Sequence, residues 1–123
     1  MPVLRYRPNG TLDPTFSGDG VASTTTFGYG FALNYGLAID GQDRVVASGS
    51  AFEAPDDHAN AFALARLTPS GALDPRFGEN GLVTTSIGHD ARGRGVALDS
   101  QGRILVAGSA QNHGAVVARY LGG

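Results

Sequence analysis

The sequence contains no cysteine, no lysine and no tryptophan, and these absences narrow the functions that it can have. Without cysteine the chain forms no disulfide, no thiolate metal site and no thiol nucleophile. No apolar run approaches the roughly 20 residues of a membrane-spanning helix. The net charge of −2 argues against nucleic acid or an anionic membrane as the main partner, and we expect no membrane insertion.

All nine basic residues are arginine. Two explanations stay open. One is the codon usage of a GC-rich genome, and the other is a need for the planar, bidentate contacts that a guanidinium makes and an ammonium does not.

Charged residues are few and apolar residues are common, which is not the composition of a disordered chain. The 19 glycines are about twice the ordinary share. Many glycines indicate many turns, as in all-β architectures built from short strands.

The chain repeats itself. The segment from Arg5 to Phe16, which contains Pro-Asn-Gly-Thr-Leu-Asp-Pro, returns from Arg66 to Phe77 as Pro-Ser-Gly-Ala-Leu-Asp-Pro. A second segment, residues 37–49 with an Asp-x-Gln-x-Arg core, returns at residues 96–108. We therefore predict a single module with one repeat at about 5–65, a second at about 66–118, and the start of a third at 119–123.

Each repeat has the pattern of four short strands and shows no helical period. The turns at Asp40 and Asp99 have the residues of tight hairpins. The alanine-rich segment 51–63 is interrupted by Pro55, and we predict a long hairpin loop there, with 110–114 as its shorter counterpart. Each predicted strand of the first repeat has a counterpart in the second. The first strand is 36–39 with counterpart 95–98, the second 44–47 with 103–107, the third 62–67 with 115–121, and the fourth 21–27 with 82–87.

Several of these strands are apolar on both faces instead of alternating. Residues 45–47 and 62–65 are examples, and so are their counterparts 104–107 and 115–118. Strands of this kind are covered on both sides, and their many small residues suit close contact between sheets. The pattern predicts an all-β fold of four-stranded blades stacked as in a β-propeller.

The two repeated segments resemble the delta-60 repeat of bacterial proteins. That family repeats Arg-Tyr-x-Pro-x-Gly-x-Leu-Asp-x-x-Phe-Gly-x-x-Gly, here at residues 5–20 and 66–81, and then Val-Ala-x-Asp-x-x-Gly-x-Ile-x-Val-Ala-Gly, here at 37–49 and 96–108. Ser17 and Ser48 depart from the pattern. The resemblance implies propeller-like tandem repeats, usually exported or at the bacterial cell surface, with no established catalytic activity.

The most distinctive local motif is Asp-Pro-x-Phe, at residues 13–16 and 74–77. We interpret it as a turn in which the carboxylate accepts backbone hydrogen bonds, proline fixes φ, and phenylalanine fills the space between blades. A phosphate-binding loop would need a strand–loop–helix context that this chain lacks. The glycines that follow the motif are predicted to have positive φ: Gly18, Gly20, Gly78 and Gly81.

Two acidic groups could bind a cation, but each has a simpler interpretation. Asp56, Asp57 and His58 bring carboxylates and an imidazole together, yet no further ligand is fixed by spacing. Asp19 and Glu79 offer oxygen ligands for Ca²⁺, in a spacing that matches no known calcium loop. We therefore expect solvated loops and turns, with no metal and no cofactor.

The segments that precede the first strand of each repeat are the candidate ligand sites. In a propeller the first strand lines the central channel, so we expect loops 29–35 and 89–94 to lie on one rim. Their aromatic, basic and amide side chains can stack on and hydrogen-bond a sugar; the alternative is that the two loops bind nothing and differ by drift. The candidate residues are Tyr29, Asn34, Tyr35, His89, Asp90, Arg92 and Arg94.

Catalysis has little support in the sequence. No nucleophile-elbow pattern presents a serine, and a paired-carboxylate hydrolase needs two placed acids. Only Asp40 and Asp99 recur near strand ends, and both fit hairpin turns. We expect a structural or interaction module that is not an enzyme, with a lectin-like carbohydrate-binding oligomer as the alternative.

Two repeats cannot close a propeller, which usually has about four to eight blades. We expect self-association, because the outer faces of the repeats would otherwise expose apolar surface. Three chains would give six blades and two would give four, and the homotrimer is favoured. Residues 3–6 and 116–121 are both predicted third strands, so a neighbouring chain could complete a blade. The alternative is an excised or engineered fragment of a longer repeat protein, because no signal peptide precedes the repeats.

Overall fold

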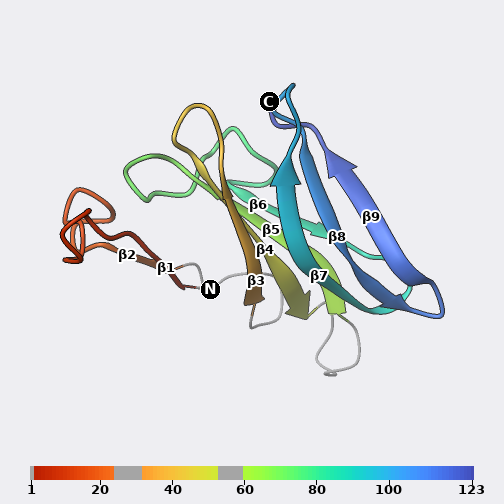
Figure 1. The fold of residues 1–123 in the computed structure, drawn as a ribbon. Helices are drawn as coiled ribbons and strands as arrows, with labels where there is room; N and C mark the ends of the chain where they lie inside the picture. Colours follow the sequence, from red (N-terminus) through yellow and green to blue (C-terminus); the bar gives the residue numbers. More distant parts are fainter. Residues whose placement is uncertain (1, 24–31, 53–59) are drawn as a thin grey trace.

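In the computed structural model the protein is all-β, as predicted, and the structure describes residues 2–23, 32–52 and 60–123 (Figure 1). The N-terminal sheet pairs β1 (Pro2–Leu4) with β2 (Val21–Ser23). The central sheet has the order β3-β4-β5-β6, and the C-terminal sheet has the order β7-β8-β9. All pairings are antiparallel. The other strands are β3 (Ala32–Ile39), β4 (Val45–Phe52), β5 (Asn60–Leu67), β6 (Leu82–Thr85), β7 (His89–Leu98), β8 (Ile104–Gln111) and β9 (Gly114–Tyr120).

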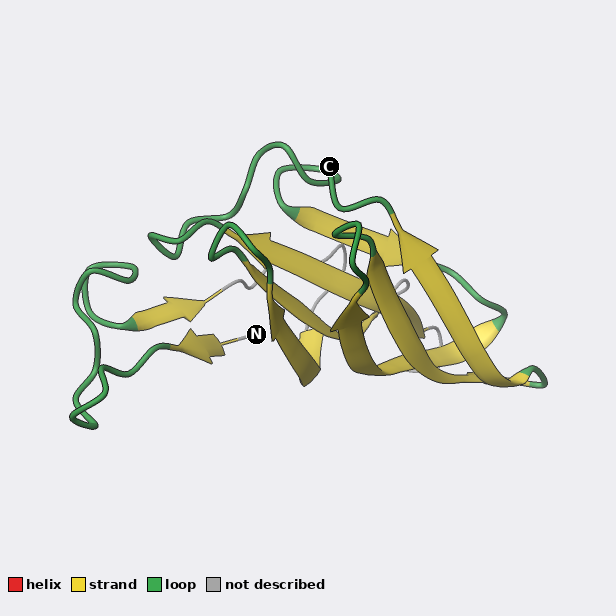
Figure 2. Cartoon of the chain, turned by 45° about the horizontal axis from the view of Figure 1, so that its top comes forward, coloured by secondary structure: helices red, strands yellow, loops and turns green. Residues whose placement is uncertain are grey.

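The three sheets follow one another in chain order, with the central sheet between the other two (Figures 1 and 2). Every residue of β5 is buried, and so is nearly all of β4. This confirms, for residues 45–47 and 62–65, the expectation that strands apolar on both faces are covered on both faces. The same expectation is wrong for residues 115–118 of β9, where Val117 is 68% exposed because no further sheet of the described chain covers that face. The central sheet is therefore the core of the described chain.

Each interface between sheets has its own apolar cluster. Phe16 and Val3 of the N-terminal hairpin pack on one face of the central sheet, against Val45 and Ala47. The opposite face of the same strands packs on the C-terminal sheet. There the buried members are Val46, Phe62, Leu64 and Phe77 with Ala91, Ile104, Val106 and Ala110.

The N-terminal sheet reproduces the last two strands of the central sheet. Val3 pairs with Ala22 in β1–β2, and Leu64 pairs with Val83 at the corresponding point of β5–β6. A bridge between Tyr6 and Leu12 has the same counterpart in the next repeat. β1 therefore corresponds to β5, and β2 corresponds to β6.

The C-terminal sheet reproduces the first three strands of the central sheet. Ile104 pairs with Tyr120 in β8–β9, as Val45 pairs with Leu67 in β4–β5. β9 thus holds the third position of its sheet, as β5 does. In the part of the chain that the structure describes, β9 has no neighbour on its outer edge.

Several predicted strand limits are wrong. The segment 51–63 was expected to be loop, yet β4 continues to Phe52 and β5 begins at Asn60; residues 53–59 lie outside the described part. Small alanine side chains allow both strands to extend between closely packed sheets. β6 ends at Thr85, before the predicted limit at residue 87. The predicted strand 21–27 is β2 only as far as Ser23, and its remainder lies outside the described residues.

Candidate functional site

The N-terminal hairpin carries a contact between an arginine, an aspartate and a phenylalanine, which we call the Arg–Asp–Phe unit. Arg5 Nε donates to Asp13 Oδ2 at 2.9 Å, and the guanidinium lies 4.6 Å from the centre of the Phe16 ring. The Thr15 amide donates to Asp13 Oδ1 at 3.0 Å, which confirms the predicted turn. One aspartate therefore holds both the turn and the arginine of the preceding strand.

A second Arg–Asp–Phe unit lies in the central sheet with the same geometry. Arg66 Nε donates to Asp74 Oδ2 at 2.9 Å, and its guanidinium lies 4.6 Å from the Phe77 ring centre. The Arg76 amide donates to Asp74 Oδ1 at 3.0 Å. Charge-assisted hydrogen bonding and a cation–π contact thus act together in each unit.

The glycines after the two turns have the backbone that the sequence predicts. Gly18, Gly20, Gly78 and Gly81 all have φ between 52° and 93°. A side chain at Gly81 would also collide with Leu73. The close return of the chain after Phe77 therefore requires glycine there.

Each unit also binds the segment that follows the third strand of the next sheet. Arg5 Nη1 donates to the Pro69 carbonyl at 2.7 Å, and Arg66 Nη1 donates to the Gly122 carbonyl. Pro69 follows β5, and Gly122 follows β9 at the corresponding position. The arginine of one sheet thus donates a hydrogen bond to the segment that follows the next sheet's third strand. The same contact occurs in both units.

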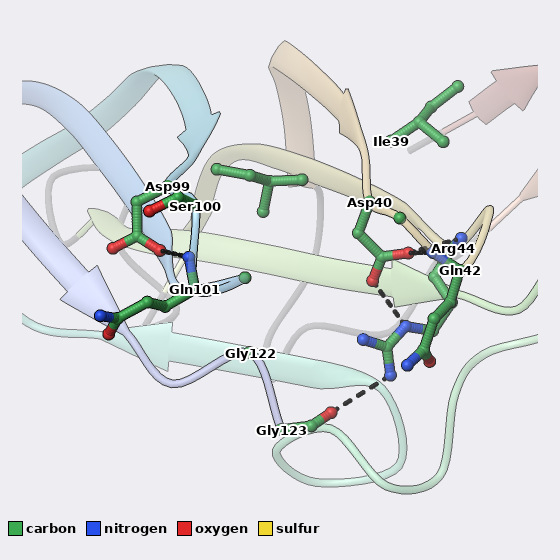
Figure 3. A pocket seen from close by; sticks show the side chains of 12 residues that line it. Ile39, Asp40, Gln42, Arg44, Asp99, Ser100, Gln101, Gly122 and Gly123 are labelled. Carbon is green, nitrogen blue, oxygen red and sulfur yellow. Dashed lines mark hydrogen bonds and ion pairs between the residues drawn. The ribbon is translucent and has the colours of Figure 1, made fainter.

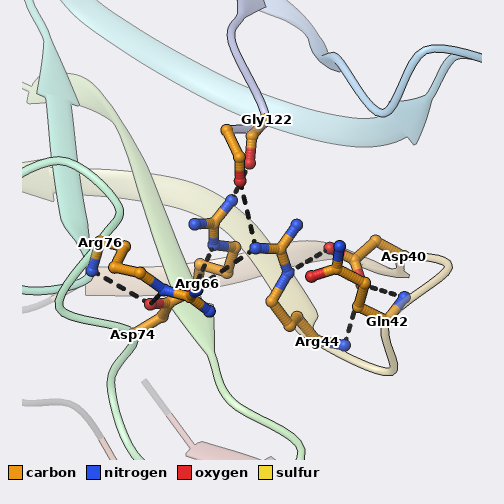
Figure 4. A network of polar contacts seen from close by, with 8 residues as sticks. Asp40, Gln42, Arg44, Arg66, Asp74, Arg76 and Gly122 are labelled. Carbon is orange, nitrogen blue, oxygen red and sulfur yellow. Dashed lines mark hydrogen bonds and ion pairs between the residues drawn. The ribbon is translucent and has the colours of Figure 1, made fainter.

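The two units differ in burial. Arg66 and Asp74 side chains are each 1% exposed, whereas Arg5 and Asp13 are 33% and 18% exposed. Figure 4 shows Arg44 beside the central unit, with its Nη1 atom 3.7 Å from Asp74 Oδ2. Arg76 Nε lies 3.5 Å from Asp74 Oδ1, so three arginines share one buried carboxylate.

The surroundings of the central unit shift its pKa values. Burial raises the pKa of Asp74, but the hydrogen bond from the Arg76 amide and the charge of Arg66 outweigh it and hold that pKa below its ordinary value. Burial and the neighbouring charge of Arg44 lower the pKa of Arg66. The Asp74 carboxylate is therefore ionised at neutral pH and pairs with the guanidinium of Arg66.

The two tight hairpin turns border a hollow of about 570 Å³ (Figure 3). Asp40 Oδ2 accepts from Arg44 Nε at 2.6 Å, and Asp99 accepts from Arg103 at the same distance. Both aspartates also accept amide hydrogen bonds within their turns, so their predicted structural role is confirmed. Arg44 Nη1 also donates to the Gly123 carbonyl. The carboxylates of Asp40 and Asp99 beside the hollow are therefore each paired with an arginine.

Within the described residues, the predicted ligand-binding loops lie in strands. Asn34 and Tyr35 lie in β3, and residues 89–94 lie in β7. Register shifts after Asn34 and after Gly93 mark β-bulges, which allow each strand to continue through its irregular part.

The bulges place Tyr35 and Arg94 at corresponding positions of β3 and β7. The Arg94 guanidinium lies 5.7 Å from the centre of the Tyr35 ring. A bulge re-aims the side chain that it carries. Two of the predicted ligand residues are thus brought together by the same irregularity in two neighbouring sheets.

Asp90 is the centre of a second polar group. Asp90 Oδ1 accepts from Asn60 Nδ2 at 2.8 Å and from Arg92 Nε at 3.0 Å. The hydrogen bond to Asp90 raises the pKa of Arg92. Asp90 itself has φ of 50°, a conformation that is uncommon outside glycine. The composition of β7 does not reveal the partnership with Asn60, which β5 contributes.

Two other predicted ligand residues have surroundings of their own. His89 is exposed at the start of β7, and Asn34 Nδ2 donates to the Pro2 carbonyl at 3.0 Å. Tyr29 lies outside the described residues, as do Asp56, Asp57 and His58. Asp19 accepts the Val21 amide at 2.9 Å, as a turn residue does.

Within residues 2–23, 32–52 and 60–123, no three histidine, aspartate or glutamate side chains gather as a metal ion would require. The same residues contain no helix long and apolar enough to cross a membrane.

The Arg–Asp–Phe unit was not singled out from the sequence, although a signal for it exists. In both repeats an arginine stands eight residues before the aspartate of the Asp-Pro-x-Phe motif. From the sequence alone, the motif is interpreted as a turn whose phenylalanine fills the space between blades, without the arginine. The bond to Pro69 or Gly122 joins distant segments, so no local pattern indicates it.

Comparison with known families bears on the same segments. Residues 3–16 and 43–77 match a family described as a domain of unknown function (DUF5122), β-propeller. The matched segments contain β4, β5 and both Arg–Asp–Phe units. No curated protein and no solved structure matches the chain. Over these segments the chain is therefore similar to a β-propeller domain of unknown function, and the match supports a propeller-like repeat family.

Proposed function

We propose that this chain is a non-catalytic structural and interaction module of the propeller type, whose copies assemble into a closed ring. Each sheet is a blade or part of one. The partial match to a propeller family and the stacked antiparallel sheets support this proposal.

The apolar surface of β9 is the observation that carries the proposal. Val117 is 68% exposed, whereas Leu64, at the corresponding position of β5, is fully buried against the C-terminal sheet. The position is therefore buried in an interface between sheets at Leu64 and exposed to solvent at Val117. Exposed apolar faces of this kind mark interaction surfaces.

The first strand of the central sheet has the matching bare face. Leu37 and Ile39 are 51% and 59% exposed on β3. Their counterparts on β7, Val96 and Leu98, pack against the central sheet. The contact between the central and C-terminal sheets supports a matching contact between copies, in which the β9 side of one copy would pack on the β3 side of another.

Such a contact is head-to-tail, and it closes into a ring when the rotation between copies permits. A trimer would have six blades, within the common range of about four to eight. Light scattering across a concentration series tests this. We expect three times the 12.6 kDa chain mass at high concentration, and a strict monomer would overturn the proposal.

The non-catalytic part of the proposal rests on how the carboxylates are used. Asp40, Asp74 and Asp99 each bind an arginine and backbone amides, and the pKa of each is lowered. Proton transfer near neutral pH needs a group whose pKa lies near the working pH. These aspartates suit turns and ion pairs.

A lectin-like function is the second candidate, and the contact between Tyr35 and Arg94 favours it. An exposed aromatic ring beside guanidinium groups can stack on and hydrogen-bond a sugar. A ring of several chains would present one such site per chain and would bind a multivalent glycan with higher avidity. A multivalent glycan array tests this candidate: binding that Tyr35→Ala abolishes would support it, and no binding at any density would end it.

Among propeller-like repeat families, we propose that the chain belongs to the delta-60 repeat family. It is supported by the two motifs at residues 5–20 and 66–81, which contain both Arg–Asp–Phe units. If it holds, the chain shares its architecture with proteins of the bacterial surface.

A further inference from the structure

β1 and β9 hold the same position in their sheets, and β1 with the two residues after it has nearly the same sequence as the end of β9. Val-Leu-Arg-Tyr at residues 3–6 corresponds to Val-Ala-Arg-Tyr at residues 117–120. In the complete central sheet this position belongs to β5, which pairs on both edges. In the described part of the chain β1 pairs only with β2, and β9 pairs only with β8.

Corresponding residues of the two strands differ in what covers them. Val3 is 5% exposed because the central sheet covers it, whereas Val117 is 68% exposed. Arg5 and Arg66 each lie between an aspartate and a phenylalanine. Arg119 is exposed and has no ion pair within the described residues. β9 thus has the side chains of a third strand without the loop that should receive them.

We propose that β9 of one copy replaces β1 of a second copy beside β2. Val117 would then stand opposite Ala22, and Arg119 would take the place of Arg5 between Asp13 and Phe16. This inference rests on the ring assembly proposed above and names the joint between copies.

The exchange is asymmetric because the two strands are held unequally. β1 has three residue pairs with β2, whereas β9 has seven with β8. Releasing β1 therefore breaks fewer backbone hydrogen bonds than releasing β9. The bonds lost from β2 are also re-formed by the incoming strand in the same register.

A side-chain contact adds to this asymmetry. Tyr120 Oη donates to Thr85 Oγ1 at 2.7 Å and ties β9 to the central sheet of its own copy. The corresponding Tyr6, two residues after the end of β1, is 58% exposed. In the proposed exchange β9 therefore remains paired with β8 of its own copy, and β1 separates from β2.

The exchange can be trapped with cysteines, because the chain has none of its own. In the variant Val21→Cys with Ala118→Cys, the two sites lie on different strands at opposite sides of one copy (Figure 1). The exchanged register would place them directly opposite each other between copies, at a Cα separation of about 5 Å that a disulfide spans. We expect oxidation to give covalent oligomers at near-complete yield.

The matched control joins β1 to β2 within one copy. Leu4 pairs with Val21, so Leu4→Cys with Val21→Cys locks β1 in place when oxidised. We expect the oxidised control to be monomeric by light scattering and the reduced control to assemble as the wild type does. Circular dichroism checks that both forms are folded.

The outcomes separate the two proposals. An oxidised control that still assembles would overturn the strand exchange and leave the ring standing. A wild type that is monomeric at every concentration would overturn both. Covalent oligomers from the first variant, together with a monomeric locked control, would support the exchange.

Discussion

At the scale of single residues, the two Arg–Asp–Phe units are a natural comparison, because they have the same geometry in different surroundings. Removing one partner of a buried ion pair leaves the other charge uncompensated, which costs about 3 kcal/mol or more. We expect Asp74→Asn to lower the free energy of unfolding by about 3 kcal/mol or more, because Arg66 beside it is buried. Asp13→Asn should have a clearly smaller effect, because that pair is partly exposed. Urea denaturation at low protein concentration measures both, and equal losses would contradict the argument.

The same carboxylate predicts how stability depends on acid. The pKa of Asp74 in the folded chain lies below its ordinary value of 3.8, so the folded state holds the charged form more strongly than the unfolded state does. This contribution is complete above pH 3.8 and is lost as the pH falls through the folded pKa. We expect the stability of the wild type to fall more steeply below about pH 4 than that of Asp74→Asn. Unfolding curves from pH 7 to pH 2 measure this, and identical acid slopes would refute it.

At the scale of strands, the bulges of β7 bring backbone from β7 close to β8. A methyl group at Gly108 on β8 would collide with the Arg92 carbonyl of β7. Backbone atoms cannot turn aside as a side chain does, so we expect Gly108→Ala to cost about 1 to 3 kcal/mol. Gly41→Ala is the control, because a methyl group there meets nothing within 4 Å. Thermal unfolding of the two variants checks this, and a matching loss for both would show that the close approach is unimportant.

Strands and turns differ in how well the sequence indicates them. Asp40, Asp74 and their counterparts were predicted as turn residues because the carboxylate accepts amides only a few positions away. The loops expected at 29–35 and 89–94 were wrong for Asn34 and His89, since β3 and β7 extend through them by means of bulges. A bulge depends on the partner strand, which a local pattern does not contain.

The Arg–Asp–Phe unit is partly predictable from the sequence, less so than the turns and more so than the bulged strands. Arg5 and Asp13 stand at a fixed spacing that recurs in the second repeat, so the sequence contained their pairing. The bond from Arg5 to the Pro69 carbonyl joins two sheets far apart in the chain, and it follows only from how the sheets stack. A residue's partners across sheets are set by the whole fold.

At the scale of the whole molecule, the proposed assembly predicts how stability depends on protein concentration. If copies cover Leu37 and Ile39, association stabilises the folded state by mass action and the Tm rises with protein concentration. We expect Leu37→Ser to remove most of this rise, because it places a hydroxyl in the middle of the contact and takes away apolar area. The side chain is half exposed in a single copy, so the variant should unfold at nearly the wild-type Tm when both are dilute. Differential scanning calorimetry over a hundredfold range of concentration measures both effects. A Tm that does not change with concentration in the wild type, or that rises equally in both proteins, would show that β3 is not the contact face.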